Sequence, residues 1–489
     1  MILLYYPCNT PPRLGRLPMS VLALGAVLEG RRDYRIIDGN VDRRALETLT
    51  GIIRGNPTGT ILCVSVMPGT QMVNAIHHSR ALKSLFPLLT IVWGGYFPSM
   101  HTESVLNSSF VDYVIRGQGE RALPELIDAL RNGSDPGLVH NVSRREGTGF
   151  LHSPEYPIYD PNDRPPFPYG RLVMEEYALP TFIGKRTYCH ESSVGCPHKC
   201  NFCGVVDVFH SRWKAERPER TLEVIRHLKG RYGMDAIEFH DSELFVSEAR
   251  MVELCEKLVD ERINWWAEGR IDTLLRYDRA TWKLMEKSGL KMIFFGAESG
   301  LDETLRMMDK GGVTRAQTVA MAALCREYHV QSEFSFVMGS HPTKTEEDID
   351  ATIDLMYELE RINPQSQMHP FIYTPVPFGS IYDKAVEGGL QYPKNLDAWA
   401  SHEWSQYTLR RRPHTPWLTP RLHRKIVNFR AVHQAYYPKT NDRFVAPWKI
   451  RLLRLVSSWR YRRRIYTAAF ELRAMLRLLV NPSPRHEGF

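Results

Sequence analysis

The residues best suited to chemistry are three cysteines near the middle of the chain. Cys196, Cys200 and Cys203 have the spacing C-x3-C-x2-C. Thiolates at this spacing can bind three corners of a cubane iron–sulfur cluster, which leaves the fourth iron open to a small ligand. A structural zinc site usually has four nitrogen or sulfur ligands in paired C-x2-C form, and no second pair follows. His190 and His198 keep a zinc knuckle open as an alternative.

The same stretch resembles the cluster motif of the radical S-adenosylmethionine (radical SAM) superfamily. The resemblance includes Phe202, the aromatic residue before the third cysteine, and Gly204, which follows it. It implies a 4Fe-4S cluster whose open iron chelates the amino and carboxylate groups of S-adenosylmethionine. Cys189 lies outside the spacing, and we expect it to be a bystander on or near the preceding strand.

Strand and helix patterns alternate regularly after the cysteines. With the strand before the cysteine loop, they predict six β/α units, which form a partial TIM-type barrel open on one side. In this architecture the turns at the carboxyl ends of the strands form the active site. The expected later strands cover residues 235–245, 264–272, 291–300, 332–339 and 367–378.

The turns at these strand ends resemble successive landmarks of radical SAM barrels. A carboxylate after the second strand suits the methionine ammonium group or the ribose, and Arg270 suits the methionine carboxylate. One departure is that His341 precedes Pro342, where the family usually has Gly-x-Pro. The residues that we predict to bind S-adenosylmethionine are Phe202, Asp241, Ser242, Glu243, Arg270, Glu298, Ser299 and Gly339.

The first 140 residues predict a separate α/β domain. Strand-like stretches alternate with helical ones, which indicates a doubly wound parallel sheet that binds ligands at the carboxyl ends of its strands. The turns W-G-G-Y-F-P-S and V-D-Y-V-I-R-G-Q-G-E resemble the cobalamin-binding domain that precedes many radical SAM enzymes. The expected strands cover residues 2–7, 34–40, 60–67, 89–95 and 111–120.

This resemblance implies cobalamin, although the D-x-H-x-x-G motif that supplies a cobalt-ligating histidine in other cobalamin proteins is absent. We therefore expect base-off cobalamin, with the loop at Met67-Pro68-Gly69 against its lower face. The alternative is a domain that has lost cobalamin and only supports the substrate pocket. The residues that we predict to bind cobalamin are Met67, Pro68, Gly69, Thr70, Gly94, Gly95, Tyr96, Gly117, Gly119 and Glu120.

Composition and charge divide the rest of the chain. The net charge is +8, but residues 401–489 alone carry +15 and the preceding residues −7, by count of the sequence. A stretch rich in proline predicts a surface linker. We therefore expect a cobalamin-binding domain at 1–140, a linker at 141–185, the barrel at 186–395 and a basic helical region at 396–489.

The basic region admits three interpretations. Its amphipathic helices can pack on the barrel, lie on an anionic membrane or bind nucleic acid. No RNA-binding motif supports the last, so we expect no nucleic-acid partner. For Trp404, Trp417, Trp448 and Trp459 we expect burial. No apolar run is long enough to span a membrane and no signal peptide is evident, so we expect a cytoplasmic protein, with peripheral membrane contact left open.

The resemblances together imply a radical enzyme. A 5′-deoxyadenosyl radical would abstract hydrogen from an unactivated carbon of a small-molecule or lipid-like substrate, and methyl transfer from cobalamin would follow. The alternative activity is a radical cyclisation like that of the anaerobic cyclase of chlorophyll synthesis, and the non-enzyme alternative is a redox-sensing protein. The implied electron donor is a flavodoxin or ferredoxin. No catalytic residue is assigned.

Overall fold

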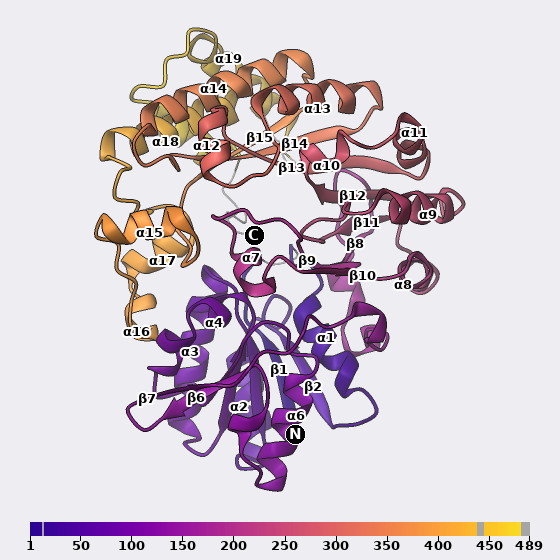
Figure 1. Ribbon diagram of the computed structural model, residues 1–489, viewed down its shortest axis with the longest axis vertical. Coiled ribbons are helices and arrows are strands. Elements are labelled where there is room, and N and C mark those ends of the chain that lie inside the picture. The colour runs from indigo at the N-terminus through magenta and orange to yellow at the C-terminus, as the bar shows by residue number, and fades with distance from the viewer. Residues whose placement is uncertain (12–13, 438–444, 481–489) are drawn as a thin grey trace.

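The computed structural model describes residues 1–11, 14–437 and 445–480. Residues 12–13 of the expected N-terminal domain, and residues 438–444 and 481–489 of the expected basic region, lie outside the described residues. Figure 1 shows two α/β halves stacked along the long axis, with the N-terminal sheet at the bottom and the barrel above it. The carboxyl ends of the N-terminal strands therefore point toward the barrel.

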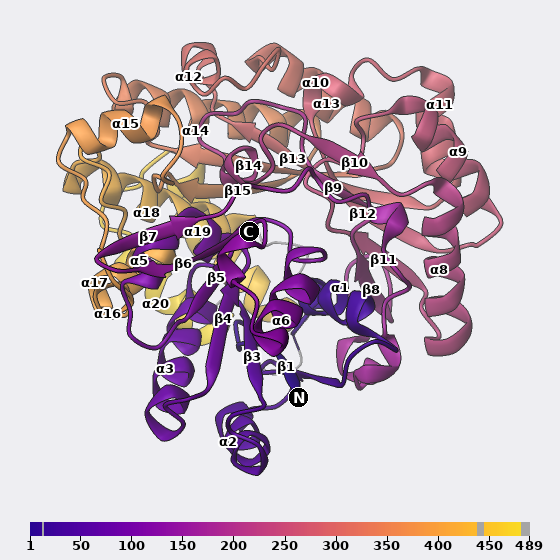
Figure 2. The ribbon, with the colours of Figure 1, turned by 60° about the horizontal axis from the view of Figure 1, so that its bottom comes forward.

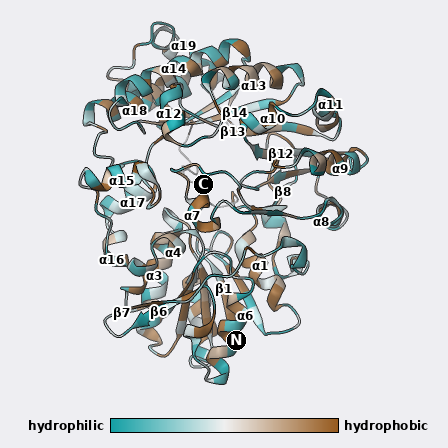
Figure 3. Cartoon of the chain, viewed as in Figure 1, coloured by the Kyte–Doolittle hydropathy of each residue, from teal (hydrophilic) through white to brown (hydrophobic). Residues whose placement is uncertain are grey.

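The N-terminal half is built on a parallel sheet, as the sequence predicted. Its first five strands run in the order β2-β1-β3-β4-β5, and Figure 3 shows how hydrophobic these central strands are. The strands are β1 Ile2–Tyr6, β2 Tyr34–Asp38, β3 Ile61–Ser65, β4 Thr90–Gly94 and β5 Tyr113–Ile115. The helices are α1 Met19–Leu28, α2 Ala45–Gly55, α3 Thr70–Leu85, α4 Tyr96–Met100, α5 Thr102–Leu106 and α6 Ala122–Asn132.

Part of the expected linker belongs to this sheet. β6 Val142–Glu146 and β7 Gly149–His152 extend it in antiparallel register beyond β5. Gly147 lies in the two-residue turn between these strands and has φ +57°. Two-residue hairpin turns favour residues that adopt a positive φ. The polar residues of these two strands, of which β7 is at the edge of the sheet, conceal the strand pattern in the sequence.

The rest of the expected linker is packed between the halves rather than laid over the surface. Arg164, Tyr169 and Tyr177 are buried, and the Tyr177 hydroxyl donates to Asp38 Oδ2 over 2.7 Å. Aromatic side chains thus give this proline-rich stretch enough apolar surface to bury. Its short helices are η2 Pro161–Asp163, η3 Tyr169–Arg171 and η4 Met174–Tyr177, while η1 Pro136–Leu138 precedes β6.

The second half is the predicted partial barrel. Its six strands follow one another in sequence order and are all parallel, while the two edge strands β8 and β15 do not pair, so the barrel is open. The strands are β8 Thr187–His190, β11 Ala236–Phe239, β12 Asn264–Gly269, β13 Leu290–Glu298, β14 Gln331–Met338 and β15 Gln367–Ile372. The helices are α8 Pro218–Tyr232, α9 Glu248–Val259, α10 Ile271–Leu274, α11 Arg279–Lys287, α12 Asp302–Met307, α13 Arg315–Glu327 and α14 Thr345–Ile362.

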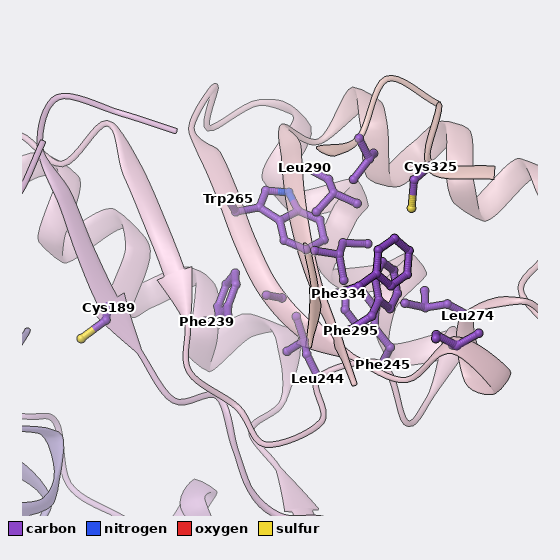
Figure 4. Packing of buried hydrophobic residues seen from close by; sticks show 14 of the residues in the cluster. Cys189, Phe239, Leu244, Phe245, Trp265, Leu274, Leu290, Phe295, Cys325 and Phe334 are labelled. Carbon is purple, nitrogen blue, oxygen red and sulfur yellow. The ribbon is translucent and has the colours of Figure 1, made fainter. Parts of the chain in front are cut away.

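The core of this half lies between the strands and the outer helices, and Figure 2 shows α8, α9 and α11 on the outer side of the strands. Alternate strand residues such as Trp265 and Phe295 point outward into this core (Figure 4). Cys325 and Cys255 are buried there as small apolar residues.

The C-terminal region begins as a clamp between the two halves. Trp399 packs on Phe97 and His101 of the N-terminal half, while the Tyr407 hydroxyl donates to the carbonyl of Pro375 beyond β15. The helices of this region are α15 Ser380–Glu387, α16 Leu396–Trp399, α17 His402–Thr408, α18 Pro420–Tyr436, α19 Pro447–Arg462 and α20 Phe470–Leu479.

The last three helices pack together on the barrel. Phe429 of α18 belongs to the barrel core, and His433 Nε2 lies 2.6 Å from Glu360 Oε1 of α14. The expected burial of the four tryptophans is wrong for Trp448 and Trp459, which are exposed on α19, while Trp404 and Trp417 are only partly buried. None of the described helices is long and apolar enough to cross a membrane.

Replacing Trp399 tests the clamp. Trp399 is 1% exposed, so Trp399→Ala should lower the stability by about 3–5 kcal/mol. Differential scanning calorimetry would record this as a lower Tm. Trp448→Ala is the control, because Trp448 is 59% exposed and should leave Tm nearly unchanged. Equal Tm values for the two variants would contradict the clamp.

Candidate active site

The cysteine loop is framed by a small hairpin and a short helix. β9 Ser193–Gly195 pairs with β10 Trp213–Ala215 in antiparallel register, and α7 Gly204–Phe209 begins directly after Cys203. The sequence did not predict this frame. It fixes both ends of the loop beyond the carboxyl end of β8.

The three cysteines of the loop are free thiols. Burial raises the pKa of the Cys196 thiol to about 12, and the neighbouring Cys203 and Cys200 sulfurs act in the same direction. Among the described residues, no three His, Cys, Asp or Glu side chains form a group that could hold a single metal ion. A cubane would bond each of the three thiolates to a different iron, so it does not require the three sulfurs to meet at one ion.

Two buried cations lie beside the loop. Arg270 Nη1 donates to Cys200 Sγ over 3.2 Å, while its other nitrogens bind Asp272. The Lys310 ammonium is 5.8 Å from the centre of the Phe202 ring and 2.6 Å from Glu298 Oε1. These cations can stabilise negative charge on the thiolates or on a bound carboxylate.

Glu243 completes this group and, unlike Asp272 and Glu298, forms no salt bridge among the described residues. The side chain is buried, and its Oε1 accepts a hydrogen bond only from the Phe245 amide among the described contacts. Burial raises its pKa to about 8, against the opposing effect of Arg270. A ligand that brings a positive charge would favour ionisation of Glu243.

Other predicted strand-end residues have structural partners. Asp241 accepts hydrogen bonds from the Ser192 amide and from the Ser192 and Ser193 hydroxyls. The Ser299 hydroxyl donates to Asp348. Both side chains are therefore already engaged by neighbouring loops.

Gly339 and Ser242 are not joined to the cation group by any of the described hydrogen bonds. Gly339 has φ +80°, and its carbonyl accepts from Trp417 Nε1 over 3.0 Å. Ser242 is exposed. The structure thus gathers Phe202, Glu243, Arg270 and Glu298 near the cysteines and separates the remainder of the predicted set.

The predicted cobalamin-binding residues line the carboxyl edge of β3, β4 and β5. The Met67 amide donates to Gln71 Oε1 over 2.7 Å, and Gly69 takes φ +90° before α3. A Cβ at Gly95 would lie 3.0 Å from Val66 N and O. Tight turns of the chain itself therefore require glycine at both positions, with or without a ligand.

The turn after β5, together with the remaining predicted residues, completes this edge. The Gly117 amide donates to Ser99 Oγ over 2.8 Å, and a Cβ at Gly119 would lie 2.9 Å from Leu24. Glu120 is buried near Arg164. Pro68, Gly94 and Tyr96 are partly exposed and Thr70 is exposed, so the edge presents a surface toward the barrel.

The two candidate cofactor surfaces meet at Tyr96 and Gly204. A Cβ at Gly204 would overlap the Tyr96 hydroxyl, so α4 and α7 approach as closely as glycine permits; Figure 1 shows them adjacent. Beside this contact is a cavity of about 230 Å³ lined by Gly117, Tyr156 and His210, among others. The glycine-rich edge and the cysteine loop therefore face one another.

Comparison with known families agrees with this arrangement. Residues 17–127 match the family described as the B12 binding domain, and residues 191–356 match the radical SAM superfamily. The chain is a cobalamin-binding radical SAM enzyme. Its cofactors are those of that class, S-adenosylmethionine and cobalamin together with the iron–sulfur cluster that the family implies, and the enzyme class replaces the redox-sensor alternative.

Three comparisons illustrate the relationship. An uncharacterized methyltransferase of Pyrococcus horikoshii is 25% identical over 80% of this chain and 81% of its own length. The anaerobic magnesium-protoporphyrin IX monomethyl ester cyclase of Synechocystis is 27% identical over 63% of this chain and 60% of its own. The structure of OxsB, a cobalamin-dependent S-adenosylmethionine radical enzyme, shares the fold with TM-score 0.72 and 17% identity, over 98% of this chain and 75% of that one.

Sequence reasoning missed Lys310, which carries a buried charge beside Phe202 and Glu298. The segment M-D-K-G-G at 308–312, with a lysine before two glycines, was the available signal. Tyr96 was assigned to cobalamin, and its contact with Gly204 was not foreseen. That contact depends on how the halves dock, which no local pattern records.

Alanine at Gly204 tests the contact between the halves. Gly204→Ala would force Tyr96 and the cysteine loop apart, so anaerobic reconstitution should give less iron per chain than the wild type. Gly230→Ala is the matched control, since a Cβ there meets nothing within 4 Å. Equal iron contents in the two variants would show that the loop does not depend on this contact.

The raised pKa of Glu243 predicts a pH dependence in the cofactor-free protein. The folded chain keeps this proton up to about pH 8, whereas the ordinary pKa is 4.5. The stability from the neutral form is complete below the ordinary pKa and is lost as the pH rises toward 8. Glu243→Gln should therefore flatten the fall of Tm between pH 5 and 8, and Glu256→Gln on the surface of α9 should not. An unchanged slope would contradict the assignment.

Proposed function

We propose that this enzyme methylates an unactivated carbon of a small-molecule or lipid-like substrate. The observation that carries the proposal is the contact between Tyr96 on the B12-binding edge and Gly204 on the cysteine loop. It makes the two surfaces border the same space between the halves. When bound there, the cluster and S-adenosylmethionine supply a 5′-deoxyadenosyl radical, and cobalamin supplies the methyl group.

Within this proposal Cys196, Cys200 and Cys203 hold the cluster. Arg270, which already donates to Cys200, offsets the thiolate charge and can reach a carboxylate of the same ligand. Glu243 is suited to an ammonium group, because a cation would remove the cost of ionising it in a buried place. Glu298 is neutralised by Lys310, which leaves it available as a hydrogen-bond acceptor.

The edge residues support a base-off cobalamin. Its three turns, 67–70, 94–96 and 117–120, contain no histidine. His78 lies on α3, where its Nδ1 is 2.6 Å from the Tyr5 hydroxyl. Met67, Pro68 and Gly69 are then the residues that would lie below the corrin, and their side chains offer no strong ligand for cobalt.

The competing activity is a radical cyclisation or oxidative rearrangement. The resemblance to the magnesium-protoporphyrin cyclase favours it, since the alignment with that relative extends over 63% of this chain at 27% identity. The two activities use the same docked surfaces and differ in whether the substrate gains a carbon or only loses hydrogen.

The proposal includes the partners of the reaction. A one-electron reductant, such as flavodoxin or ferredoxin, would have to reach the cluster, and the chain would work in the cytoplasm. A reacting space between the two halves would limit the access of water, which would protect a radical from side reactions.

Replacing Cys200 with serine tests the cluster, and product mass then separates the activities. The wild type should hold about four irons per chain and cleave S-adenosylmethionine, and Cys200→Ser should do neither. Cys255→Ser, at a buried cysteine in the barrel core, is the control and should keep its iron. An unchanged iron content in Cys200→Ser would contradict the assignment of Cys200 as a cluster ligand.

Mass spectrometry of the product, once a substrate is known, separates the two activities. A gain of one CH2 supports methylation, and loss of hydrogen alone supports the cyclase.

A further inference from the structure

The outer face of α19 carries an unbroken apolar stripe. Trp448, Leu452, Leu455 and Trp459 are spaced four, three and four residues apart, which aligns them along one side of a helix. All four are exposed, Leu455 to 74%. The opposite side of α19 is buried through Leu453, Ser457 and Tyr461, so the exposed stripe is not needed to dock the helix.

Positive charge surrounds this stripe. Residues 445–480 contain nine Lys and Arg and a single Glu, by count of the sequence. That Glu471 is taken by Arg460, and Arg464 pairs with Asp354. The exposed Arg451, Arg462 and Arg463 have no carboxylate partner among the described residues.

Each of these features suits a lipid surface. Tryptophan prefers the boundary between lipid headgroups and acyl chains. A helix with an apolar stripe flanked by arginine lies in that boundary, where the arginines attract anionic headgroups. Figure 1 places α19 at the end of the molecule farthest from the N-terminal sheet, so a membrane there would not obstruct the space between the halves.

We propose that α19 docks the enzyme on the surface of an anionic membrane through its Trp448–Trp459 stripe. The fixed position of the helix adds to its affinity, because no folding has to accompany binding. The charge pattern distinguishes this partner from a neutral surface or a second copy of the chain. A second copy would place the unpaired arginines of both chains near one another, which is unfavourable.

Sedimentation with vesicles tests the proposal on the full-length protein. The wild type should bind vesicles of equal parts phosphatidylglycerol and phosphatidylcholine, and should bind phosphatidylcholine alone far more weakly. Leu455→Ser and Trp459→Ser should each weaken binding, the pair about tenfold or more. Leu88→Ser is the matched control, because Leu88 is also 74% exposed and lies in the N-terminal half; it should bind like the wild type.

Three results would overturn the proposal. They are no binding to anionic vesicles, equal binding to both vesicle types, and an equal loss in Leu88→Ser and Leu455→Ser. Self-association in solution that Leu455→Ser abolishes, without vesicle binding, would instead assign the stripe to a second copy. Unchanged Tm and unchanged cleavage of S-adenosylmethionine in the variants would separate loss of docking from loss of folding or of the proposed activity.

Discussion

The site depends on the balance between buried positive charge and the three thiols. Arg270 touches Cys200 directly, and Lys310 lies over Phe202. Unpaired, either cation would be costly to bury, so Asp272 and Glu298 hold them in place. Burial raises the pKa of Cys196 and so opposes deprotonation of the thiols. Binding of a cluster would offset the charge of the thiolates, and the buried cations beside the loop favour the same charged state.

Contacts elsewhere in the chain hold the two halves together around these cations and thiols. Arg16 from the loop after β1 binds Glu238 of β11 through both carboxylate oxygens. On the opposite flank Trp399 and Tyr407 join the N-terminal half to the end of β15. The halves are thus tied on two sides, while Tyr96 and Gly204 set how closely they approach between the ties.

Periodicity and motif spacing predicted the sheet, the open barrel and the cysteine loop, because each is written in local pattern. They did not show which strand-end residues are free to bind a ligand. Asp241 and Glu243 are two residues apart, yet Asp241 accepts hydrogen bonds from Ser192 and Ser193, whereas Glu243 has almost no hydrogen-bond partner. The position of Lys310 in the site and the exposure of Trp459 were not predicted for the same reason, because both depend on which distant segment packs nearby.

Under the proposed function, the inner wall of the barrel would restrict the substrate further. Along β12 the outward residues Trp265 and Ala267 are buried, whereas Trp266 and Glu268 on the inner side are partly exposed. Burial raises the pKa of Glu268 to about 7, and Glu333 accepts from Trp266 Nε1 over 2.9 Å. A wall that offers aromatic faces beside carboxyl groups favours a substrate with both an apolar body and hydrogen-bond donors. A bare hydrocarbon chain would leave Glu268 desolvated without a partner, and would bind there at a cost.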